Sequence, residues 1–148
     1  MNAQRVAARS DALGDTNRGL ARLDTRRLSY SVKKCIIDNI ASKNIILTIS
    51  NFGQISLIGE DRKVHHIVQL AELKSLTWVY DEQDSDLHEI VINHKTSFDY
   101  VLDCMNHDEK DKIFGSLKYI FWKMNRANLP IYAVPAGLRD SVITSKHM

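Results

Sequence analysis

The sequence predicts a mainly β domain of seven short antiparallel strands. They form a barrel or sandwich capped by one C-terminal amphipathic α-helix, and a short basic helical arm precedes them. Three observations lead to this prediction. Short runs of β-branched and aromatic residues, separated by turn residues, fill positions 29–103. One strong helical pattern follows at 106–125. The first 28 residues are rich in Ala, Arg and Leu and contain no β-branched run.

The N-terminal arm, residues 1–28, carries six arginines against three aspartates, a net charge of +3. Val6, Leu13 and Leu20 recur every seven residues, which is typical of one face of a helix. Two glycines in the arm each weaken a helix by about 1 kcal/mol. We therefore expect a marginally helical arm that lies on an anionic surface or an acidic partner. Its candidate contact residues are Arg5, Arg9, Arg18, Arg22, Arg26 and Arg27.

Seven strands are expected between the arm and the helix. They are "SYSVKKCIID", "NIILTIS", "QISLIG", "VHHIVQL", "SLTWVY", "LHEIVIN" and "SFDYVLD". The first alternates apolar and polar residues, and the second is a short β-branched run. The turns between them include "NFG", "EDRK" and "HKT", and "DEQDSD" is expected to be a solvated loop. Short strands at this spacing are typical of a small antiparallel barrel or sandwich.

The C-terminal helix has the clearest boundaries. Asn106 and Glu109 have the spacing of a capping box, and acidic residues occupy the first turn. One apolar stripe follows, formed by Ile113, Phe114, Leu117, Ile120, Phe121 and Met124. We expect this stripe to close the open end of the barrel. The domain boundaries follow as an arm at 1–28, the folded domain at 29–126 and an extended tail at 127–148.

The residues that most often carry chemistry do not form a catalytic pattern. His65 and His66 are adjacent on an expected strand, so their side chains should point to opposite faces and should not share a metal. The acidic residues of 81–89 sit mostly in a solvated loop, where water opposes a raised carboxyl pKa. Cys35 lies beside two lysines, but a small cysteine on a strand usually fills a core. We expect no enzyme, no cofactor and no metal site.

Nucleic acid is not an expected partner. The spacing of four aromatic residues follows the expected strands and helix, which favours core packing over a platform for stacking bases, and basic residues do not interleave with them. They are Trp78, Trp122, Phe114 and Phe121.

The two cysteines support neither a disulfide framework nor a zinc site and indicate a reducing compartment. No apolar run approaches the length of a transmembrane helix, and no secretory signal begins the chain. We expect a cytoplasmic protein, with attachment to cytoskeleton or membrane as further alternatives. The closing "TSKHM" does not obviously end the fold, so a fragment or a tail leading elsewhere is expected.

Seven antiparallel strands followed by one helix is an order similar to that of the pleckstrin-homology (PH) superfold. Segments 43–58 and 63–92 more specifically resemble the tail homology 1 domain of class I myosins, which is itself PH-like. The shared features are Leu47, Thr48, Ile55, Leu57, Ile58, Lys63, Val64, Leu73, Leu76, Ser85 and Asp86. The resemblance implies a non-catalytic module that places a larger protein on a membrane or on a partner.

The resemblance also implies a place for a lipid head group. Family members with lipid affinity use basic residues on the first two strands and their connecting loop. In this sequence those positions correspond to Lys33, Lys34 and Lys43, but Ile45 stands where a further arginine is expected. Arg62 and Lys63, with the arm, complete the candidate lipid- or partner-binding set.

We favour protein recognition because the lipid motif is incomplete, with the groove between the C-terminal helix and the strand edges as the peptide site. The alternative is weak, salt-sensitive binding to anionic phospholipid through the lysines and the arm. A third hypothesis is coiled-coil-like assembly through residues 3–24. We do not expect a calmodulin-like light chain on the arm. Compared with a calmodulin-binding neck motif, this sequence has Gly14 in place of a glutamine, and its last basic residue, Arg22, lies one position too early.

Overall fold

The computed structural model describes residues 27–143, so every arm residue named above except Arg27 lies outside the described part. Within this part, residues 29–49 and 53–143 belong to the larger of two compact units, and residues 27–28 and 50–52 belong to the smaller one. The larger unit holds the hydrophobic core and the candidate site. The elements are β2 (Arg27–Ile37), β3 (Ile40–Ser50), β4 (Gln54–Ile58), β5 (Val64–Gln69), η2 (Leu70–Glu72), β6 (Leu73–Tyr80), β7 (Glu89–His94), β8 (Tyr100–Cys104), α1 (His107–Asn125), β9 (Ile131–Pro135) and η3 (Ala136–Val142).

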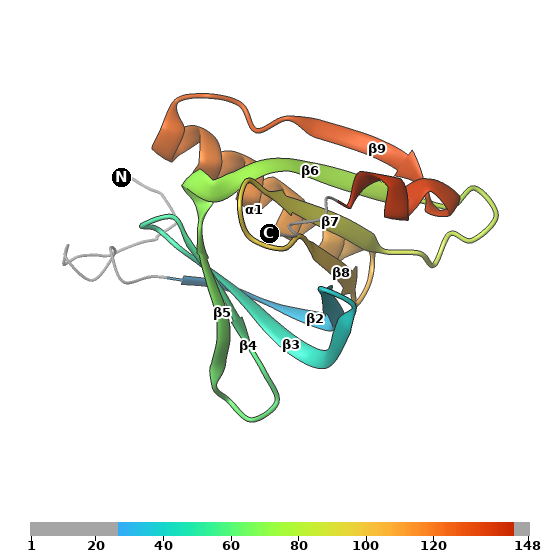
Figure 1. The fold of residues 1–148 in the computed structure, drawn as a ribbon, viewed down its shortest axis with the longest axis horizontal. Coiled ribbons are helices and arrows are strands. Elements are labelled where there is room, and N and C mark those ends of the chain that lie inside the picture. The colour runs from blue at the N-terminus through green and yellow to red at the C-terminus, as the bar shows by residue number, and fades with distance from the viewer. Residues whose placement is uncertain (1–26, 144–148) are drawn as a thin grey trace. The chain divides into compact units, whose positions relative to one another are not determined.

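The strands form one sheet in the order β5-β4-β3-β2-β8-β7-β6-β9. All seven strands predicted from the sequence are present. Antiparallel pairing joins β2 to β8, β3 to β4, β4 to β5, β6 to β7, and β7 to β8. Helix α1 contacts η2, β7 and β8, and Figure 1 shows it running behind β6 and β7. A mainly β unit with one C-terminal helix is therefore confirmed.

Strand alternation builds the core. On β3 the side chains of Ile45, Leu47 and Ile49 are buried at alternate positions, and on β4 Ile55 and Leu57 are buried in the same way. All five belong to one cluster that also includes Ile113, Leu117 and Ile120 of α1. The apolar stripe of the helix and the inward faces of the strands therefore share one core, as their periods predict.

Helix α1 begins and ends where its sequence predicts. Asn106 is the N-cap, and its side-chain oxygen accepts a 2.8 Å hydrogen bond from the backbone N–H of Glu109. Arg126 ends the helix in the left-handed region at φ 54°. The buried stripe is shorter than expected, because Met124 is 47% exposed. No helix within residues 27–143 is long and apolar enough to cross a membrane.

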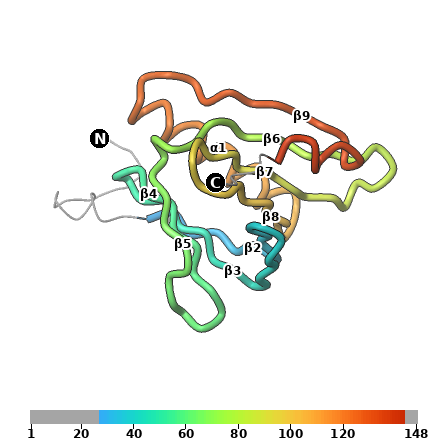
Figure 2. The backbone as a smooth tube through the Cα atoms, viewed as in Figure 1, coloured from blue at the N-terminus to red at the C-terminus, as the bar shows by residue number. Residues whose placement is uncertain are grey.

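The sheet has eight strands rather than the predicted seven. Residues 131–135, expected only as an extended tail, form β9, which pairs with β6 in parallel from Leu76↔Ile131 to Tyr80↔Pro135. Figure 2 shows the chain leaving α1, running along β6 as β9 and turning back as η3. The sequence did not reveal this strand because its side chains are mostly exposed and its partner is more than 50 residues away. An edge strand of this kind is held mainly by main-chain hydrogen bonds.

The C-terminal segment also covers a second, smaller core on the other face of the sheet. Val79, Val91 and Val101 are buried there, and Val134 and Val142 pack against them. Asn93, 4% exposed, joins this segment to the sheet, because its Nδ2 donates to the Val142 carbonyl at 2.8 Å. Strand β9 and η3 therefore pack against the sheet.

Candidate functional site

A cavity of about 550 Å³ opens between the β2–β3 turn and the β4–β5 loop. Ligand pockets in proteins commonly measure about 300–1,000 Å³, so this cavity has the size of a binding site. The residues that line it are Cys35, Ile37, Asp38, Ile40, Ser42, Lys43, Ile45, Leu57, Gly59, Glu60, Asp61, His65, His66 and Phe98.

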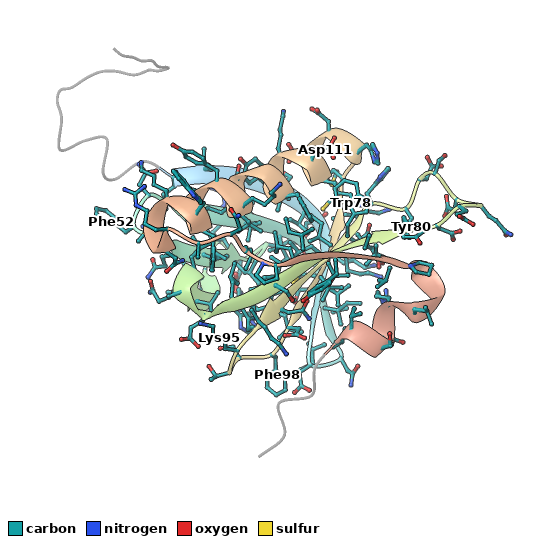
Figure 3. All side chains as sticks on the ribbon, turned by 90° about the horizontal axis from the view of Figure 1, so that it is seen from above. Phe52, Trp78, Tyr80, Lys95, Phe98 and Asp111 are labelled. Carbon is teal, nitrogen blue, oxygen red and sulfur yellow. The ribbon has the colours of Figure 1, made fainter. Side chains whose placement is uncertain are left out.

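The floor and the rim of the cavity differ in exposure but are both apolar. Cys35, Ile45 and Leu57 are buried members of the core. Ile40 and Phe98 are 68% and 38% exposed. Figure 3 shows Phe98 projecting from the molecule on the side away from α1. An apolar group entering the cavity would therefore contact apolar side chains both at the rim and at the floor.

The β4–β5 loop is fixed by local hydrogen bonds. The backbone N–H of Arg62 donates to the Gly59 carbonyl at 2.9 Å, and Arg62 adopts φ 66°. Asp61 accepts from the backbone N–H of Lys63 at 3.0 Å, and its two carboxylate oxygens lie 2.9 and 3.0 Å from Nε2 of His65. A Cβ on Gly59 would stand 2.7 Å from that same nitrogen. Glycine at this position therefore leaves the space that the His65 ring occupies.

His65 and His66 line the same cavity, so the expectation that they point to opposite faces is wrong. The reason is an irregularity in the β4–β5 register, where Leu57 pairs with His66 but the next residue, Ile58, pairs with Val64. A bulge of this kind inserts an extra residue and re-aims side chains. Even so, within residues 27–143 no group of three or more His, Cys, Asp or Glu side chains is placed to hold a metal ion.

Local hydrogen bonds and burial shift the pKa values of three ionisable groups at the cavity. The hydrogen bond from the Lys63 backbone, followed by that from His65, lowers the pKa of Asp61. Burial, with a smaller contribution from His65, lowers the pKa of His66. Burial raises the pKa of Cys35 to about 12, so its thiol stays protonated at neutral pH and is a poor nucleophile.

The charge of the cavity is the reverse of what a phosphate site needs. Asp38, Glu60 and Asp61 contribute three carboxylates, against one ammonium group from Lys43. The Nδ2 of Asn44 donates to Glu60 at 2.9 Å, which holds that carboxylate in place. A polyphosphate head group is bound by several cations and N–H donors, so these carboxylates oppose it.

The structure brings together only part of the predicted basic set. Lys43 lines the cavity, whereas Lys33, Lys34, Arg62 and Lys63 do not. Lys33 is exposed on β2, and Lys34 is half-buried. The described arm residue, Arg27, is exposed at the start of β2.

One of the two sheet edges that could accept a peptide is occupied by the chain itself. Strand β9 pairs with β6 along five residues and fills that edge. At the opposite edge of the sheet, β5 is the terminal strand.

The interpretation of Trp122 as a core residue is wrong, because its side chain is 44% exposed.

Sequence reasoning missed most of the cavity. Asp38 lies in the β2–β3 turn, Ile40 begins β3 and Phe98 lies between β7 and β8, and these segments are adjacent only after folding. A weak signal existed in Ile40 and Phe98, which are large apolar residues placed next to turn residues where burial within a strand is not assured.

The sequence matches no known protein family and no curated protein. Among solved structures it is similar to the PH domain of human oxysterol binding protein-related protein 11. The identity is 17% and the TM-score 0.53, over 68% of this chain and 84% of that one. It is also similar to the PH domain from PfAPH, at 12% identity and TM-score 0.50, over 72% of this chain and 88% of that one.

A third structure, the Spt16D Pob3N heterodimer, aligns with 72% of this chain and 54% of its own at 13% identity and TM-score 0.49. At these identities the likeness concerns the fold alone. The more specific resemblance to the class I myosin tail domain stays a prediction. The chain has a PH-like fold, as its strand and helix order predicted.

Proposed function

We propose that this chain is a non-enzymatic, PH-like interaction module that recruits or scaffolds a larger assembly through protein contacts. Its cavity would take an apolar side chain of the partner. The observation that carries the proposal is the composition of the cavity, which has apolar walls, an exposed apolar rim and three carboxylates against one lysine. An apolar side chain flanked by a basic residue fits this surface in both shape and charge.

Burial and local turns account for the cysteines and for two carboxylates of the acidic loop. Both cysteines are buried, and burial raises their thiol pKa values to about 12. In the acidic loop, Asp81 and Asp84 accept hydrogen bonds from backbone groups two residues further on, which is a local turn arrangement. A binding module needs none of these groups to react.

The test is a selection of peptides from a random display library on the 148-residue chain, followed by affinity measurement on the enriched peptides. We expect peptides with an apolar anchor beside a basic residue. Their affinity should fall about tenfold or more for Phe98→Ser, which corresponds to about 1.4 kcal/mol. Tyr132→Ser, which changes another exposed aromatic residue outside the cavity, should bind like the parent.

Two outcomes would contradict the proposal. One is equal binding by the parent and Phe98→Ser. The other is co-sedimentation with phosphatidylserine or phosphatidylinositol bisphosphate vesicles, but not neutral ones, that is lost at high salt and in the variant carrying Lys33→Glu and Lys34→Glu. The second result would establish peripheral attachment to anionic membrane as the function in place of protein recognition.

A further inference from the structure

The C-terminal part of α1 is basic without an acidic counterpart. From position 112 to position 126 the sequence "KIFGSLKYIFWKMNR" contains four basic residues and no Asp or Glu. The acidic residues of the helix are confined to its beginning, at Asp108, Glu109 and Asp111. This arrangement complements the helix dipole, which accounts for the sign of the charges but not for the aromatic residues among them.

Two large aromatic side chains lie exposed within this basic segment. Tyr119 is 60% exposed and Trp122 is 44% exposed, and neither belongs to the core clusters. Positions three and four apart are neighbours on a helix surface, so both lie beside exposed basic residues. We call the five residues Lys118, Tyr119, Trp122, Lys123 and Arg126 the aromatic–basic face.

The cations of this face are available to a partner. Within residues 27–143, no carboxylate forms an ion pair with Lys118, Lys123 or Arg126, whereas Lys112 pairs with Asp108 at 3.2 Å. The guanidinium carbon of Arg126 lies 5.3 Å from the centre of the Trp122 ring. Stacking of this kind holds an arginine and a tryptophan as one surface, and both types are enriched among residues that dominate binding energy.

We propose that the aromatic–basic face docks an acidic segment of a partner protein. Carboxylates of that segment meet Lys118, Lys123 and Arg126, and its apolar side chains pack on Tyr119 and Trp122. Charge complementarity defines the occupant, because the face has three cations and two aromatic rings, and none of its five residues carries a carboxylate. This surface is separate from the cavity, so the inference goes beyond the proposed function.

A protein segment fits this face better than a membrane does. Asp111 precedes Trp122 by eleven residues, which places it within about 20° of the same side of the helix and about 16 Å along the axis. Figure 3 shows Asp111 at the acidic end of α1. A flat anionic leaflet lying along the helix would meet Asp108 and Asp111, which are exposed. A short peptide can contact the basic end alone.

The test uses the full 148-residue chain and the same random display library, with dissociation constants of enriched peptides measured by fluorescence anisotropy. We expect a class of peptides rich in Asp or Glu with interspersed apolar residues. Their affinity should fall at least tenfold in the double variant Lys118→Glu with Lys123→Glu, and in Trp122→Ala. It should also weaken as salt concentration rises.

The matched control is the double variant Lys74→Glu with Lys95→Glu, which changes charge by the same amount at exposed positions outside this helix. It should bind acidic peptides like the parent, as should Phe98→Ser. The helix variants and Phe98→Ser therefore test the two surfaces separately, so the experiment can reject acidic-peptide binding by α1 without rejecting peptide binding in the cavity. Circular dichroism of each variant confirms that it is folded.

Four results would overturn the inference. The first is that no acidic class is enriched, and the second is that acidic peptides bind both double variants equally. The third is sedimentation with phosphatidylserine vesicles that the Lys118→Glu and Lys123→Glu variant alone loses, which would assign the face to a membrane. The fourth is concentration-dependent self-association lost in that same variant, which would assign it to a second copy of this chain.

Discussion

Replacing Asn93 by alanine should remove the polar connection that joins β7 to the C-terminal segment. Its side-chain oxygen accepts from the hydroxyls of Ser75 at 3.0 Å and Thr77 at 3.2 Å. Its Nδ2 donates to the Asp99 carboxylate at 2.9 Å and to the Val142 carbonyl at 2.8 Å. All four partners lose one hydrogen bond in the variant.

The expected loss follows from these four bonds. A neutral hydrogen bond contributes about 1 kcal/mol net, and one to a charged group about 1.5–3 kcal/mol. Three neutral bonds and one to a carboxylate sum to about 5 kcal/mol. Partial rearrangement of the exposed parts of the segment reduces this figure, so we expect a loss of about 3–5 kcal/mol. That is a large fraction of the 5–15 kcal/mol by which native proteins are usually stable.

Urea unfolding followed by circular dichroism measures this loss as a change in midpoint at constant slope. The control is Asn128→Ala, an exposed asparagine, which should change the free energy of unfolding by less than about 0.5 kcal/mol. A loss below about 1 kcal/mol for Asn93→Ala would refute the reasoning. It would mean that the C-terminal segment does not depend on this side chain.

Four further predictions concern stability. Truncation after Asn128 removes β9 and η3, so it should lower the urea midpoint and expose the second core to a hydrophobic dye. Gly53→Ala should destabilise by 1 kcal/mol or more, because Gly53 has φ 81° and the new Cβ would stand 2.9 Å from a methionine sulfur. Gly115→Ala, with open space around it inside a helix, should instead stabilise by up to about 1 kcal/mol in the same urea assay. Burial raises the pKa of Cys35 from 9.0 to about 12, so the folded state keeps a proton that the unfolded chain loses. Stability should therefore fall between pH 9 and 12, and less steeply in Cys35→Ala, as thermal melts across that range would show.

Each of these predictions has an outcome that would contradict it. An unchanged midpoint after truncation would support the boundary at residue 126 that the sequence suggested. Equal effects of alanine at both glycines would show that neither the positive φ nor the close sulfur matters. Equal alkaline slopes for the parent and Cys35→Ala would show that this thiol titrates alike in the folded and unfolded states.

The local patterns of the sequence were sufficient for the seven strands and the helix. Alternation on β3 and β4 places the side chains that become the core, and the spacing of Asn106 and Glu109 marks where α1 begins. These signals are local because a strand or a helix repeats its side-chain direction every two or 3.6 residues. Their order along the chain was enough to suggest the PH-like fold.

Only the tertiary structure decided the features on which the functional proposals rest. The parallel pairing of β9 with β6 joins distant segments through main-chain hydrogen bonds, which carry no side-chain period. Because of the bulge in β5, His65 and His66 both line one cavity, whereas a regular strand would place their side chains on opposite faces. The cavity itself combines residues from separate turns, so its charge and shape depend on distances between segments that the sequence does not specify. The exposure of Trp122 has the same origin, because which side of a helix is buried depends on what packs against it.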